Sequence, residues 1–157
     1  MRYLKVIASI VFCIAFFRSE TCFPQENIRK TMLSEVNELR RTGCMCGSEY
    51  MPPVKELVWS APLERAAWEH AVDMFRNDFF DHSSSDGSTL ADRVDATGFK
   101  WSIIGENICW GYYSVEDAVN GWKNSPDHCH NMMDPRFRIM GAARQGSYWV
   151  LDLGKED

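Results

Sequence analysis

The segment Trp101–Trp110, WSIIGENICW, is an apolar run with the length of a buried strand, and it carries one carboxylate, Glu106. A carboxylate in the middle of an apolar strand must find cations or hydrogen-bond donors that offset its desolvation. The alternative interpretation is structural, because a buried glutamate commonly holds a loop by accepting backbone N–H groups. We therefore place this segment in the sheet and take Glu106 as the first candidate functional residue.

Helical patterns lie on both sides of this strand. Apolar residues recur at helical spacing over residues 27–41. Three further helices are predicted from their start signals: Ser60 as an N-cap before Pro62, Ser88-Thr89 before a short helix that Gly98 closes, and Ser114 as the start of a capping box. Helices thus dominate the predicted secondary structure.

Strand patterns are fewer. Arg138–Arg144 and Ser147–Leu153 flank Gln145-Gly146 as a hairpin, whereas residues 43–53 read as a loop rich in Gly, Cys and Pro. A few strands with helices packed around them predict an α+β domain whose sheet is antiparallel at least in the hairpin. Neither a βαβ repeat nor a glycine-rich phosphate loop indicates a nucleotide site.

Length and charge narrow the class of protein. The chain has 157 residues, with 17 Lys and Arg against 22 Asp and Glu, so its formal net charge is −5. No repeat, low-complexity tract or long linker divides it, which favours one domain. An acidic chain has no electrostatic drive toward phosphate backbones, so nucleic-acid binding is disfavoured.

The first residues predict export. Arg2 and Lys5 precede the apolar run Val6–Phe17, which has the length of a signal-peptide core and is too short to span a bilayer. We predict a signal peptide over residues 1–21, cut after Ser19 or Thr21, and a single domain over 22–157. Lipid anchoring at Cys22 is disfavoured because Ser-Glu-Thr precedes it. The product is expected to be secreted, extracellular or periplasmic, and not transmembrane.

Residues 22–157 contain five cysteines: Cys22 at the edge of the predicted domain, and Cys44, Cys46, Cys109 and Cys129 inside it. An oxidising compartment favours disulfides, and four cysteines allow three pairings. Cys44 and Cys46 are too close in sequence to bond each other with good geometry, so each is expected to pair with one of Cys109 and Cys129. A zinc site is the rival interpretation, but no C-x-x-C motif is present.

Two histidines stand beside Glu106 as candidates. His82 follows a predicted helix and precedes a Ser-rich loop, and His128 follows Ser125-Pro126-Asp127. A lone histidine is more often structural than catalytic, and His70, on the apolar stripe of its helix, is interpreted as a core or interface residue. His130 is two residues past His128 and points elsewhere on either a helix or a strand.

Several ordered motifs resemble the CAP superfamily, the cysteine-rich secretory, antigen 5 and pathogenesis-related 1 proteins, also called the SCP domain. The motifs are Phe80-Asp81-His82, Ser85-Asp86-Gly87, Gly105-Glu106-Asn107-Ile108, the stretch Gly121–His128, and Gly141-Ala142 before Tyr148-Trp149. The resemblance runs from about Ile28 to Leu153 and is closest to the short bacterial type. It implies a three-layer α-β-α sandwich with a small antiparallel sheet between helices.

The resemblance also implies a cleft. His82 and His128 correspond to its two histidines and Glu106 to its first acid, whereas Ser125 stands where the eukaryotic pattern has a second acid. Two imidazoles and one carboxylate suit a divalent ion such as zinc, with water completing the shell.

For the cysteines, the resemblance implies a bridge between Cys46 and Cys129. That pairing leaves Cys44 with Cys109.

Two classes of function follow from these features. The resemblance implies a binding module for a lipid, a sterol or another protein, since the family includes secreted proteins that bind such ligands. This function is favoured because a rigid disulfide-stapled domain suits recognition outside the cell. The alternative is a metal-assisted, protease-like hydrolase in which Glu106 or a histidine acts as general base. Its weakness is the nucleophile: residues 83–85 are serines in a glycine-flanked loop, and no G-x-S-x-G elbow is present.

Overall fold

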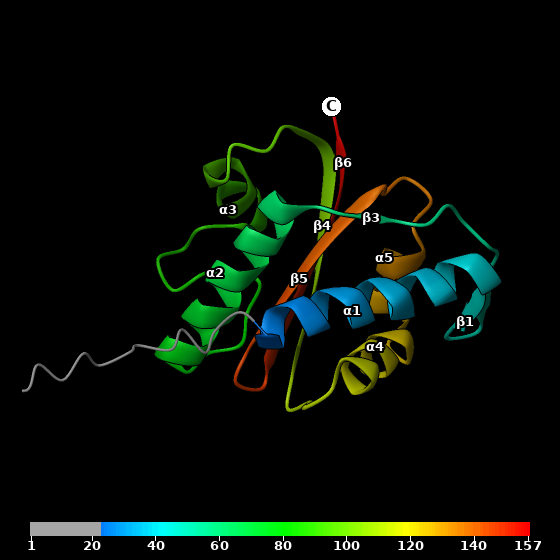
Figure 1. Cartoon of the computed structure of the whole chain (residues 1–157), viewed down its shortest axis with the longest axis horizontal. Coiled ribbons are helices and arrows are strands. Elements are labelled where there is room, and N and C mark those ends of the chain that lie inside the picture. Colours follow the sequence, from blue (N-terminus) through cyan, green and yellow to red (C-terminus); the bar gives the residue numbers. More distant parts are fainter. Residues whose placement is uncertain (1–22) are drawn as a thin grey trace, which may run out of the picture.

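The computed structural model describes residues 23–157, so the predicted signal peptide 1–21 and Cys22 lie outside the described residues. This part of the chain contains five helices and six strands (Figure 1). The helices are α1 (Phe23–Thr42), α2 (Ala61–Asn77), α3 (Leu90–Ala96), α4 (Val115–Lys123) and α5 (Pro126–Met133). The strands are β1 (Cys44–Cys46), β2 (Glu49–Met51), β3 (Val58–Trp59), β4 (Trp101–Trp110), β5 (Ile139–Gln145) and β6 (Tyr148–Glu156).

The main sheet has the strand order β3-β5-β6-β4. The predicted hairpin forms its β5 and β6, and β6 also pairs antiparallel with β4, the WSIIGENICW segment. In this register Glu106 lies directly opposite Asp152. The small β3 adds a parallel pairing to β5, so the expected antiparallel sheet has one short parallel edge strand in addition.

Helices cover both faces of the sheet, which confirms the three-layer α-β-α sandwich (Figure 1). On one face lie α1, α4 and α5, and on the other lie α2 and α3. Side chains of the central strands alternate between the two faces. Ala142 and Leu151 therefore join the core beneath α1 and α4, whereas Ala143 and Val150 join the core beneath α2.

The helix starts agree with the sequence signals. The Ser60 side chain accepts a hydrogen bond from the backbone N–H of Leu63, and Thr89 forms a reciprocal capping box with Asp92. Ser114 caps α4 by accepting a hydrogen bond from the backbone N–H of Asp117. Each cap satisfies a backbone donor that has no partner inside its helix.

Two segments form elements that the sequence patterns did not predict. The chain after Ser125 is the helix α5, since Pro126 supplies the backbone angle of a first helical position. Within the predicted loop, β1 and β2 form a second antiparallel sheet that pairs Cys44 with Met51 and Cys46 with Glu49.

Close packing of α2 on β5 explains the Gly141-Ala142 motif. A Cβ atom on Gly141 would lie 2.0 Å from the backbone nitrogen of Glu64, in the first turn of α2. Backbone atoms cannot yield as a flexible side chain can, so this contact requires glycine. The motif thus fixes how closely the second helix approaches the sheet.

One of the two predicted disulfides is present. Cys46 and Cys129 form a disulfide, with their Cα atoms 5.4 Å apart. The expected bridge between Cys44 and Cys109 is wrong, because both are free thiols among the described residues. Cys44 and Cys46 alternate with Met45 on β1 and therefore face the same side, toward Cys129. Cys109 lies in the separate core beneath α1 and α4.

Candidate functional site

The site centres on Glu106, in the middle of β4. One carboxylate oxygen, Oε1, lies 2.6 Å from Nδ1 of His82, and the other, Oε2, accepts a hydrogen bond from the Arg93 guanidinium at 2.6 Å. The Glu106 and Arg93 side chains are 3% and 6% exposed, whereas His82 is 57% exposed. The group therefore runs from a buried ion pair to an imidazole that solvent reaches.

Arg93, on α3, also holds the loop that carries His82. Its guanidinium donates hydrogen bonds to the backbone oxygens of His82 at 3.1 Å and Ser88 at 3.3 Å, and to Oγ of Ser84 at 3.0 Å. One arginine thus fixes both the carboxylate and the loop beside it, since its planar fork donates in several directions at once.

The charges within the group support one another. Burial opposes ionisation of Glu106, but the hydrogen bond from His82 and the Arg93 charge outweigh it and lower the pKa of Glu106. The same hydrogen bond raises the pKa of His82, against the smaller opposing effect of its own burial. A carboxylate held ionised in this way fixes the tautomer of the neutral imidazole, with the proton on Nδ1.

His128, on α5, has a different partner. Its Nδ1 lies 2.9 Å from Oγ of Ser125, the residue that replaces the second acid of the eukaryotic pattern. Burial lowers the pKa of His128, and the nearby His82 charge lowers it further. Two amides dock α5 on the sheet: Asn107 donates to the His128 backbone oxygen at 2.9 Å, and Asn131 donates to the Glu106 backbone oxygen at 3.1 Å.

Of the three predicted site residues, the structure bonds His82 to Glu106 and leaves His128 outside this hydrogen-bonded pair. The group of metal-ligating side chains whose donor atoms lie within 4.8 Å of one another, over residues 23–157, is instead Cys44, Cys46 and Cys129. Two of these sulfurs are joined in a disulfide, so the cluster does not offer three thiolates while that bond is intact.

The other two described histidines lie as the sequence suggested. His70 is fully buried, with Nε2 at 2.9 Å from the backbone oxygen of Asp81. His130 points away from the site, toward Glu49, whose carboxylate lies 3.0 Å from its Nε2.

Sequence reasoning missed two residues of the site, Arg93 and Asp152. Asp152 is fully buried on β6 opposite Glu106, and within residues 23–157 neither of its oxygens has a hydrogen-bond donor. Burial, and then the Glu106 charge, raise the pKa of Asp152 well above its ordinary value. The available signal was a carboxylate inside the apolar run YWVLDLG, the same signal that identified Glu106.

The Asp152→Asn variant should gain stability relative to the wild type as pH rises. Above the ordinary pKa of 3.8 the unfolded chain loses the Asp152 proton, whereas the folded chain keeps it, so wild-type stability falls with pH. A neutral amide does not titrate, so the variant lacks this contribution to the pH dependence. Urea unfolding at pH 4 and pH 7 should show a relative gain on the order of 1 kcal/mol or more at pH 7.

The matched control is Asp86→Asn. Asp86 is exposed, and hydrogen bonds from Ser88 lower its pKa, so removing this carboxylate shifts the pH dependence in the opposite direction. An Asp152→Asn variant that loses the same stability at both pH values would contradict a protonated Asp152.

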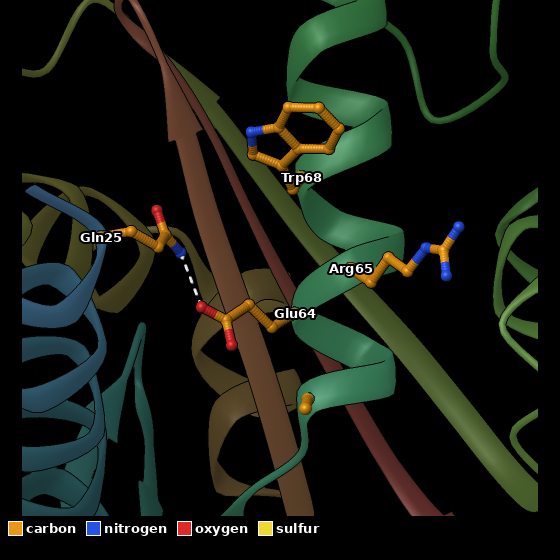
Figure 2. A pocket seen from close by; sticks show the side chains of 5 residues that line it. Gln25, Glu64, Arg65 and Trp68 are labelled. Carbon is orange, nitrogen blue, oxygen red and sulfur yellow. Dashed lines mark hydrogen bonds between the residues drawn. The ribbon is translucent and has the colours of Figure 1, made fainter. Parts of the chain in front are cut away.

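A separate hollow of about 260 Å³ lies between α1 and α2 and contains none of the predicted site residues (Figure 2). Figure 2 shows Gln25 and Glu64 pointing toward each other, with a 3.0 Å hydrogen bond between them. Glu64 also accepts from Arg29 at 2.7 Å and from the Trp59 indole at 2.9 Å. These contacts link α1 to α2 across the edge of the sheet.

Two proteins of Bacillus subtilis (strain 168) are similar in sequence. The chain is 30% identical to the uncharacterized membrane protein YlbC over 100 residues, which cover 64% of this chain and 29% of YlbC. It is 31% identical to the uncharacterized protein YkwD over 99 residues, which cover 62% of this chain and 38% of YkwD. The chain thus matches less than half the length of each curated relative.

Solved structures share the fold. An extracellular protein with an SCP domain from Bacillus anthracis str. Ames has a TM-score of 0.74 at 22% identity, covering 84% of this chain and 41% of that one. An outer surface protein from Borrelia burgdorferi has a TM-score of 0.72 at 22% identity, covering 85% and 96%. NaASP2, solved with Zn²⁺, has a TM-score of 0.60 at 16% identity, covering 83% and 84%.

The family follows from sequence and fold together. The model of the cysteine-rich secretory protein family, CAP, matches residues 33–152, which run from α1 to β6 and include the whole candidate site. Over residues 23–157, no helix has both the length and the apolar character needed to cross a bilayer. The matched motifs and the shared sandwich make this chain a bacterial-type member of the CAP superfamily, the cysteine-rich secretory protein family.

Proposed function

We propose that the chain is an exported binding module in which His82 and His128 hold a divalent metal ion, with zinc as the favoured ion. The observation that carries this proposal is the same in both histidines: Nδ1 is engaged by a side-chain oxygen, Glu106 for His82 and Ser125 for His128. A histidine whose Nδ1–H donates to an oxygen presents the lone pair of Nε2 to a metal.

Glu106 takes the role of an orienting carboxylate in this proposal. Both of its oxygens already have partners, His82 and Arg93, so it fixes the His82 ring and raises the basicity of the imidazole. His128 contributes a ring whose lowered pKa keeps it neutral at pH 7, the form that binds metals. Water completes the shell around the two imidazoles, in place of the carboxylate of the predicted set of two imidazoles and one carboxylate.

The zinc-bound state of NaASP2, a protein with the same fold, supports the choice of ion. The extracellular Bacillus anthracis protein and the Borrelia burgdorferi outer surface protein support export. We propose that the bound partner is a lipid, a sterol or another protein.

The serines of residues 83–85 favour binding over hydrolysis. Ser84 Oγ accepts a hydrogen bond from Arg93, and Ser85 donates from its hydroxyl and its backbone N–H to Asp73 at 2.6 and 2.8 Å. Both hydroxyls therefore hold the loop in place. The alternative function is a metal-assisted hydrolase, in which a bound zinc ion would activate a water and Glu106 or a histidine would act as general base.

Zinc binding should depend on both histidines. We expect isothermal titration of the oxidised full chain with zinc chloride to show one site, which His82→Ala and His128→Ala each weaken at least about 100-fold. Glu106→Gln removes the charge that orients His82, together with the ion pair to Arg93, and should weaken the site about 10- to 100-fold. Affinity should also fall below neutral pH, because the hydrogen bond to Glu106 raises the pKa of His82 and protons compete for its imidazole.

His130→Ala is the matched control, since His130 lies on the same helix as His128 but faces Glu49. Equal zinc affinity in the wild type, His82→Ala and His128→Ala would refute the site. Zinc-dependent cleavage of a fluorescent casein that Glu106→Gln abolishes would replace the binding function by the hydrolase.

A further inference from the structure

Three sulfur atoms meet where β1 packs against α5. Cys46 and Cys129 are bonded, and the free Cys44 Sγ lies 3.7 Å from Cys129 Sγ. All three sulfurs lie within 4.8 Å of one another and are buried together with Met133. One disulfide and one thiol therefore share a single apolar cluster.

The geometry of β1 explains why two cysteines face one partner. Residues that alternate along a strand point to the same side, and β1 is buried at Cys44 and Cys46 but exposed at Met45. A bonded pair of sulfurs is about 2.05 Å apart, so the Cys44 and Cys129 sulfurs need to approach by roughly 1.7 Å from their 3.7 Å separation. Rotation of the side chains with a shift of the β1 backbone would have to close this gap and bring the Cys44 sulfur in line with the Cys46–Cys129 bond.

We propose that this cluster is an internal thiol–disulfide exchange centre, in which Cys129 bonds alternately to Cys46 and to Cys44. The Cys44 thiolate attacks Cys129 Sγ, the Cys44–Cys129 bond forms, and the Cys46–Cys129 bond breaks. Cys46 leaves as a thiolate and takes up the proton that Cys44 released. One disulfide and one thiol are present before and after, so the step needs neither oxidant nor reductant.

The surroundings make this exchange slow and confined to the chain. Burial raises the pKa of the Cys44 thiol, and the Lys123 charge on α4 partly opposes this shift. A small thiolate fraction slows the attack. Because the cluster is buried, a second protein's thiol cannot reach Cys129 as easily as Cys44 can. In both isomers β1 remains tied to α5.

The exchange would shift the covalent link between α5 and β1, beside the candidate site. Cys129 directly follows His128, and the two bonding positions on β1 lie two residues apart, about 7 Å along a strand. Exchange therefore moves the attachment point of α5 along β1 without releasing the helix. This inference depends only on the sulfur cluster and holds whether or not the histidines bind zinc.

Mapping of the disulfide in the oxidised full chain tests the proposal, with Cys22→Ser in the background so that this thiol cannot join. After incubation at pH 8, the protein is quenched in acid, unfolded in guanidinium, labelled with N-ethylmaleimide and digested with pepsin. Fragmentation spectra then locate the label. We expect two species, one labelled at Cys44 and one at Cys46, with Cys109 labelled in both as an internal reference. Label at Cys44 alone would overturn the proposal.

Two variants test the exchange independently of the wild-type mapping. Cys46→Ser should form the Cys44–Cys129 disulfide. Neither Cys44 nor Cys129 should then be labelled by N-ethylmaleimide. Cys44→Ser should keep Cys46–Cys129 and show a single species at every incubation time. If Cys46→Ser folds and retains both Cys44 and Cys129 as labelled thiols, the exchange is refuted; if it does not fold, the wild-type mapping decides.

Discussion

Arg93→Ala is expected to lower the free energy of unfolding by about 3–5 kcal/mol, because it leaves the Glu106 carboxylate buried without its cation. In the wild type the Arg93 nitrogen lies 2.6 Å from the Glu106 oxygen, and the two side chains are only 6% and 3% exposed, so the pair is largely shielded from water. The same change removes the hydrogen bonds that Arg93 donates to the backbone oxygens of His82 and Ser88. Urea unfolding at pH 7 measures the loss.

A double-mutant cycle separates the stability lost by leaving the Glu106 charge unpaired from that lost with the packing of the Arg93 side chain. Glu106→Gln in the Arg93→Ala background removes the unpaired charge and should recover part of the lost stability. The control is Arg65→Ala, whose ion pair with Glu69 lies on the exposed side of α2 and should contribute no more than about 1 kcal/mol. A loss in Arg93→Ala as small as that in Arg65→Ala would show that the buried pair does not stabilise the fold.

Helix starts and the long strand were predictable because their signals are local. Ser60 and Thr89 cap helices through bonds to residues only three positions ahead. Trp101–Trp110 matches β4 at both ends, since an apolar run bounded by polar turns defines its own limits. Glu106 was identifiable for the same reason, as a charge inside such a run.

Features that depend on which strands pair were not predictable from one sequence. Asp152 lies opposite Glu106 only because β6 pairs with β4 in one register, and a shift of one residue would turn it to the other face. Arg93 reaches Glu106 from α3, which depends on the docking of that helix. The Cys44–Cys109 bridge was expected only as the pair left over beside Cys46–Cys129, and it is wrong because β1 turns Cys44 toward Cys129.

Cys129→Ser should cause a second large loss of stability. The Cys46–Cys129 bond joins residues 83 positions apart, and closing a loop of that size in the unfolded chain corresponds to about 4.5 kcal/mol in the chain-entropy model. Because Cys129 is the sulfur common to both isomers of the exchange, no other bond can compensate. Thermal unfolding should show a fall in Tm on the order of 10 °C or more.

Substitution of the other two cysteines separates the stability lost with the disulfide bond from that lost with a cysteine side chain. Cys44→Ser keeps the disulfide and Cys46→Ser allows the substitute, so each should lose much less stability than Cys129→Ser. A Cys129→Ser variant as stable as Cys44→Ser would mean that the bond constrains the unfolded chain little.

The zinc site should respond differently from overall stability. The backbone of α5 remains docked by Asn107, which donates to the oxygen of His128, and by Asn131, which donates to the oxygen of Glu106. While Cys129→Ser remains folded, well below its Tm, His128 should therefore keep its place and zinc affinity should stay within about threefold of the wild type, a difference of about 0.7 kcal/mol. If zinc affinity fell together with stability, the disulfide itself would position His128, because the amide contacts alone would then be insufficient.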